Sequence, residues 1–132
     1  AGFYQKLGDF EKTINAWIKR AEVEPKNPEA WHTIRAYYQT KVFTDKRLSK
    51  PVALDLTMKA LEAEDKALAL SPDYYEAVTY KNILLRQEAL YVNDPAKVKA
   101  LLAEADVLLK RGMELRDKQA GEVAKGGKKD GK

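Results

Sequence analysis

The stretch GDFEKTINAWIKRAEVEPKNPEAW, residues 8–31, predicts two amphipathic helices joined at a proline. In its first half Phe10, Ile14 and Trp17 recur at spacings of four and three residues, which is the period of a single helix face. Pro25 then ends this helix, because proline lacks the backbone N–H that another turn would need. The stretch carries no obvious catalytic group, so its aromatic residues need a structural explanation.

Further residues that are typical of helix starts and helix ends follow along the chain. Gly8 is predicted to end a helix over residues 1–7, and Asp9 to cap the next helix. Asn27 followed by Pro28 is typical of a helix start, with a capping side chain and a proline in the first turn. The helices expected from these signals and from apolar periodicity cover residues 10–24, 28–40, 51–70, 73–91 and 95–118. Nothing alternates with a period of two over enough residues to suggest a sheet, so the sequence predicts an all-α fold.

Composition excludes several classes of function. The chain has no cysteine and its single histidine is His32, which excludes disulfides, thiolate sites and multi-histidine metal sites. The net charge is +4, but acids and bases interleave along the chain instead of gathering as a nucleic-acid binder's would. No apolar run approaches the roughly 20 residues of a membrane span. We therefore predict no metal, no cofactor, no nucleic-acid partner and no membrane span.

No catalytic constellation is predicted either. Glu62 and Glu64 lie two residues apart, so on a helix they point in different directions and cannot act as a carboxylate pair. We interpret both as solvated charges. His32 follows Trp31 directly, so we expect it to face away from the core stripe, on the surface or in a groove. The sequence predicts that the protein is not an enzyme.

Two segments of the chain resemble each other. AEVEPKNPEAW and LALSPDYYEAV both contain an apolar run, a proline, a short polar link, then Glu-Ala and a large apolar residue. These segments resemble the tetratricopeptide repeat (TPR) family in a degenerate, bacterial-type form, whose unit of about 34 residues is a helix pair. The positions that carry the resemblance, and that we expect to pack between repeats, are Gly8, Phe10, Trp17, Pro25, Trp31, Ile34, Tyr38, Ala60, Ala67 and Pro72.

The resemblance implies a short right-handed solenoid of antiparallel helix pairs, with about two and a half to three repeats over residues 1–118. The chain departs from the family pattern in three places. Thr13 and Arg20 replace small residues of the pattern, and Glu64 stands where an aromatic residue is expected. The interval between the two repeat-closing prolines is also longer than one unit, which predicts an insertion at residues 41–50.

The two ends of the chain carry further expectations. The chain begins in the middle of what should be a first helix, which suggests a fragment lacking an N-terminal part. Residues 119–132 are rich in Gly and Lys and are predicted to form a flexible tail. Because a targeting region could precede the first residue, cytoplasm and periplasm both remain open.

The resemblance implies a non-enzymatic scaffold that binds a protein or peptide on the concave face of its stacked helix pairs. The first helix of each pair lines that face, which assigns partner binding to Glu29, His32, Gln39, Asn82 and Arg86. The alternative is a structural or accessory subunit of a larger assembly, which makes its contacts through outer helix faces and the 41–50 insertion. Sequence alone leaves both functions open.

Overall fold

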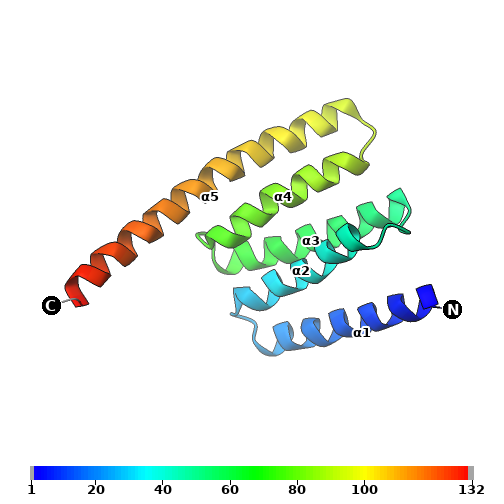
Figure 1. Ribbon diagram of the computed structural model, residues 1–132, viewed down its shortest axis with the longest axis horizontal. Coiled ribbons are helices and arrows are strands. Elements are labelled where there is room, and N and C mark those ends of the chain that lie inside the picture. Colours follow the sequence, from blue (N-terminus) through cyan, green and yellow to red (C-terminus); the bar gives the residue numbers. More distant parts are fainter. Residues whose placement is uncertain (1, 131–132) are drawn as a thin grey trace. The chain divides into compact units, whose positions relative to one another are not determined.

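The computed structural model describes the backbone of residues 2–130 and the side chains of residues 8–124. Over residues 2–130 the chain is helical and contains no strand, as the sequence predicted. The helices are α1 (Gly2–Val23), α2 (Pro28–Thr44), α3 (Lys50–Leu70), α4 (Tyr75–Tyr91) and α5 (Pro95–Asp130), coloured in chain order in Figure 1.

The chain divides into two compact units between Pro72 and Asp73. In the first unit α2 packs against both α1 and α3, and in the second unit α4 packs along α5. The sequence predicted one repeat domain over residues 1–118, so the observed division falls inside the predicted domain.

Local side-chain caps explain where several helices begin. The Asn27 side chain accepts a hydrogen bond from the Glu29 backbone N–H at 3.0 Å, which confirms the predicted cap ahead of Pro28. Asp94 accepts in the same way from the Ala96 N–H at 3.0 Å, ahead of the proline that opens α5. These caps satisfy backbone donors that have no partner inside the helix.

The core of the first unit combines small and large side chains. Its buried members are Ala21, Ala30, Ile34 and Ala63, with Trp17, Ile18, Trp31 and Tyr38 packed against them. Ala60 and Ala67 of α3 are also fully buried. Alanines on neighbouring helices let the helix backbones approach closely, and the aromatic rings fill the remaining space.

Two helix boundaries in the first unit differ from the prediction. α1 runs unbroken through Gly8, so the predicted helix end there and the cap at Asp9 are wrong. No described glycine has a positive φ, and a glycine inside a helix costs only about 1 kcal/mol, which its neighbours can offset. α2 continues to Thr44 instead of ending at residue 40, and buries Val42 in doing so. The predicted 41–50 insertion is therefore partly helical.

Two helix boundaries in the second unit also differ from the prediction. α4 begins at Tyr75, two residues after the predicted start at residue 73, and the preceding Tyr74 makes no side-chain cap. The Asp73 carboxylate instead accepts a hydrogen bond from Arg111 of α5 at 2.9 Å. α5 continues through residues 119–130 and is therefore longer than the predicted helix over residues 95–118. The flexibility of residues 119–132 stays a prediction. Residues 1, 131 and 132 lie outside the described part of the chain.

Several large apolar residues of α5 are partly exposed. Leu102, Leu109 and Met113 are 37%, 42% and 49% exposed. Leu101 and Ala105 are buried, and Gly112 lies in close contact with Thr79 of α4. The packed face of α5 is therefore narrower than its apolar sequence suggested.

Candidate functional site

Two adjoining hollows lie along α2, between α1 and α3 of the first unit. The larger one, about 350 Å³, and the smaller one, about 160 Å³, share Tyr38 and Lys59 in their walls. We call the two hollows together the α1–α3 groove. Its larger part is lined by Phe10, Glu11, Ile14, Asn15, Val52, Asp55 and Leu56, and its smaller part by Ile18, Trp31, Ile34, Glu62, Ala63 and Lys66.

The floor of the groove is apolar and partly aromatic. Ile34 of α2 and Ile14 of α1 are almost fully buried beneath it. The Tyr38 ring meets the Phe10 ring edge-on, with ring centroids 5.8 Å apart. Burial raises the pKa of the Tyr38 hydroxyl, so this group stays uncharged near neutral pH.

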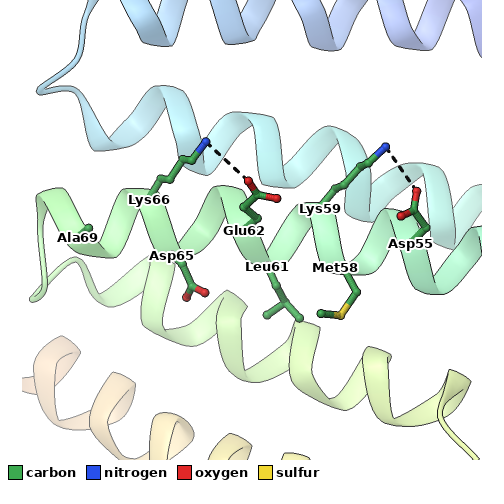
Figure 2. Close-up of a pocket in the computed structure, with 8 residues that line it drawn as sticks. All are labelled: Asp55, Met58, Lys59, Leu61, Glu62, Asp65, Lys66 and Ala69. Carbon is green, nitrogen blue, oxygen red and sulfur yellow. Dashed lines mark ion pairs between the residues drawn. The ribbon is translucent and has the colours of Figure 1, made fainter.

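Charged residues of α3 form one rim of the groove. Asp55, Lys59, Glu62 and Lys66 recur at spacings of four, three and four, and Figure 2 shows them on one side of the helix. Lys59 pairs with Asp55 at 3.4 Å, and Lys66 with Glu62 at 3.9 Å. The rim therefore alternates in sign along the groove and remains largely exposed to solvent.

Lys66 also joins the rim to the floor. Its Nζ lies 4.3 Å from the centroid of the Trp31 ring, within the range of a cation–π interaction. Lys66 thus covers the edge of the smaller hollow, and its charge lies next to an aromatic surface.

A wider hollow of about 600 Å³ lies on α3 alone, and Figure 2 draws its residues. Met58, Leu61 and Asp65 point to the side of the helix opposite the charged rim. Because one helix provides only a single wall, we treat this hollow as exposed surface and not as a binding site.

A buried charge cluster lies between α2 and α3, separate from the groove lining. The Glu64 side chain is fully buried, and its carboxylate lies 3.0 Å from Arg35 Nε and 2.9 Å from His32 Nδ1. Arg35 Nη1 also donates to Gln39 Oε1 at 2.7 Å. Buried charges are tolerated only when they are paired in this way.

The His32 ring lies between the other two charged groups of the cluster. His32 Nδ1 is 2.9 Å from Glu64 Oε1 and 3.1 Å from Glu64 Oε2. Arg35 Nη2 is 3.1 Å from His32 Nε2 and 3.4 Å from His32 Nδ1. The ring therefore contacts both the carboxylate and the guanidinium group.

Burial raises the pKa of Glu64, while the hydrogen bond from His32 and the charge of Arg35 oppose this rise. The interpretation of Glu64 as a solvated charge is therefore wrong, whereas Glu62 is exposed as expected. Sequence contained one usable signal: Glu64 stands at a core position of the repeat pattern, between the buried alanines Ala60 and Ala67.

The residues predicted to bind a partner fall into two groups, one in each unit. In the first unit His32 and Gln39 belong to the buried charge cluster, and Glu29 is exposed near the start of α2. In the second unit Asn82 is buried and accepts from Arg86 Nε at 2.8 Å. Four of these five side chains are thus engaged in intramolecular hydrogen bonds, and their role in partner binding stays a prediction.

Arg86 is the most accessible of these four residues. Its Nη2 donates to Asp106 of α5 at 2.6 Å, and 39% of its side chain is exposed.

Among the residues whose placement is described, no three His, Cys, Asp or Glu side chains come together as metal ligands would. No helix in that part of the chain is long and apolar enough to cross a bilayer.

Comparisons with known proteins add little to this geometry. No family model and no curated protein matches the chain. Among solved structures it is similar to one described as the crystal structure of MamA, with 17% sequence identity over 89% of this chain and 94% of that chain. The TM-score is 0.24, too low for this similarity to carry an argument about fold or function.

Proposed function

We propose that this chain is a non-enzymatic scaffold of helix pairs, like those of the TPR family, that binds a protein partner. The α1–α3 groove carries the proposal, because it is an open surface with an apolar, aromatic floor and a charged rim. Interfaces between proteins favour such surfaces, in which a desolvated centre lies inside a polar edge. Right-handed stacking of about two and a half to three repeats, as the resemblance implies, belongs to this proposal.

The position of the groove bears on the two functions that sequence left open. In the TPR-like assignment α1 and α3 are the second helices of consecutive pairs, which lie on the outer face. A partner in this groove would contact the outer helix faces, as an assembly subunit would. The predicted concave residues would first have to give up hydrogen bonds, such as the one between His32 and Glu64.

Affinity purification of the intact protein from its native source, with quantitative mass spectrometry, tests the proposal. We expect at least one protein to be recovered at fixed stoichiometry with the unmodified chain. Charge reversal on the rim, in the double variant Lys59→Glu/Lys66→Glu, should release that protein. Circular dichroism should show that the variant remains helical.

One control variant and two variants of the predicted concave face locate the binding surface. Lys110→Glu changes an exposed lysine on α5 and should leave recovery unchanged. If His32→Ala or Arg86→Ala releases the partner and the rim variant does not, the predicted concave face is the binding surface instead. If no protein is recovered at fixed stoichiometry, the scaffold function itself is contradicted.

A further inference from the structure

We infer that the α1–α3 groove binds one amphipathic α-helix of the partner, with a basic end of that helix over Glu11 and Asp55 and an acidic end over Lys66. This inference rests on the proposed scaffold function and specifies the partner's chemistry. Three properties of the groove support it: an apolar floor, its length along α3, and a difference in charge between its two ends.

The apolar floor favours a helix over an extended peptide. Ile18, Ile34 and Ala63 present hydrocarbon to the smaller hollow and offer no hydrogen-bond partner. An extended segment lying on them would bury backbone N–H and C=O groups without partners, which is unfavourable. A helix satisfies these groups internally and brings only side chains to the floor.

The dimensions of the groove agree with a helix lying across it. The lining residues of α3 extend from Val52 to Lys66, which corresponds to about 21 Å of helix and roughly four turns. Hollows of about 350 and 160 Å³ accept individual side chains and not a whole helix. A partner helix would therefore insert apolar side chains from one face and leave its opposite face in solvent.

The charges of the lining residues give the groove a direction. Lys59 lines both hollows and pairs with Asp55 at 3.4 Å, so it is counted once, with the larger hollow. Glu11 and Asp55 then leave that end net acidic, whereas the smaller hollow holds the neutral pair of Glu62 and Lys66, with Lys66 as its last charged residue along α3. The two ends therefore differ in charge, and a helix with a basic end over Glu11 and Asp55 would be favoured in one orientation.

The ion pairs already present on the rim do not prevent its charged residues from pairing with a partner helix instead. The side chains of Asp55 and Lys59 are 65% and 51% exposed, and those of Glu62 and Lys66 are 70% and 50% exposed. Exposed pairs at this spacing contribute little to stability, because water solvates both charges. Each charge can therefore turn to a partner at little cost.

Two synthetic helical peptides test the inference with the full-length chain. Both are about four turns long, with the same composition and the same apolar stripe. In the block peptide, lysines occupy one half and glutamates the other; in the mixed peptide, the charges alternate. We expect fluorescence anisotropy at low salt to show the block peptide binding about tenfold more tightly than the mixed one.

Variants and cross-linking locate the block peptide. Lys66→Glu should weaken its binding about tenfold, and Lys110→Glu on α5 should not change it. A photo-cross-linker at the basic end should label the region of Glu11 and Asp55, and one at the acidic end the region of Lys66. Equal affinity for both peptides, or equal labelling of both regions from either end, would overturn the inference.

Two further outcomes separate this inference from the scaffold function on which it rests. If neither peptide binds while affinity purification still recovers a partner released by the rim variant, the helix assignment fails and the scaffold stands. If the protein alone is a dimer by light scattering and Lys66→Glu makes it monomeric, the groove holds a second copy, which also overturns the inference.

Discussion

The two units differ in how deeply both partners of their ion pairs are buried. In the first unit Arg35 and Glu64 meet with side-chain exposures of 7% and 0%. In the second unit Arg86 meets Asp106 across α4 and α5 with exposures of 39% and 70%, and Arg111 meets Asp73 with 47% and 71%. The second unit also buries the carboxylate of Glu88, but its partner Lys97 is 55% exposed. Each of these second-unit pairs therefore has a partner exposed to solvent, whereas both partners of the first-unit pair are buried.

Burial changes how much stability is lost when one partner of an ion pair is removed. Removing one partner of a buried pair leaves an uncompensated charge in a medium that solvates it poorly. Removing one partner of an exposed pair leaves a charge that water solvates. The second unit should therefore depend less on its ion pairs and more on how closely α4 and α5 approach.

The largest expected effect is that of Glu64→Ala. We expect it to lower the free energy of unfolding by about 3–5 kcal/mol, because Arg35 remains buried without its carboxylate. Urea denaturation followed by circular dichroism measures this change. Glu62→Ala, two residues away and exposed, should change stability by less than about 0.5 kcal/mol. Similar losses in both variants would show that burial does not matter here.

The close approach of α4 and α5 predicts a smaller effect for Gly112→Ala. A Cβ at this position would lie 2.8 Å from Thr79 Oγ1, so either the Thr79 side chain or one of the two helices must shift. We expect a loss of about 1–2 kcal/mol, although alanine is the better helix former.

Gly121→Ala is the matched control, because nothing lies within 4 Å of its added Cβ. This substitution should be neutral or stabilise α5 by up to about 1 kcal/mol. If Gly112→Ala is equally well tolerated, the contact with Thr79 does not limit the packing of the second unit.

A pH titration of stability should also distinguish the buried cluster. The pKa of Glu64 is raised in the folded state, so the folded protein binds the proton of this carboxyl group more tightly than the unfolded chain does. Its contribution to stability is complete below its ordinary pKa of 4.5 and is lost as pH rises through the folded value. Glu64→Gln should therefore show less loss of stability than the unmodified protein as pH rises above 4.5.

The exposed pairs predict the smallest effect. Arg111→Ala should lower stability by less than about 1 kcal/mol, and added salt should reduce the difference further. Thermal denaturation at low and high salt measures both. A loss as large as that of Glu64→Ala would contradict the contrast between the two units.

Local signals predicted the parts of the fold that depend on local chemistry. Apolar periodicity and the Asn27–Pro28 start gave the all-α class and the beginning of α2, because caps and helix faces are properties of neighbouring residues. The helix end predicted at Gly8 is wrong, because a glycine ends a helix only where the chain turns. Whether it turns there depends on packing that the local sequence does not specify.

The candidate site could not be predicted from the sequence for the same reason: it depends on how the helices pack. The groove combines residues of three helices, from Phe10 to Lys66, and its hollows result from how those helices pack. Glu64 was read as solvated because charged residues are almost never fully buried unless they are paired. Its partners His32 and Arg35 lie about thirty residues earlier, beyond any helical spacing.

The most direct test of the account is partner recovery with the single variants Lys66→Glu and Lys110→Glu, compared with the unmodified chain. Both reverse one exposed lysine, but only Lys66 lines the α1–α3 groove. We predict that Lys66→Glu reduces recovery of the stoichiometric partner about tenfold while Lys110→Glu leaves it unchanged. Equal recovery with both variants would contradict the groove as the binding surface.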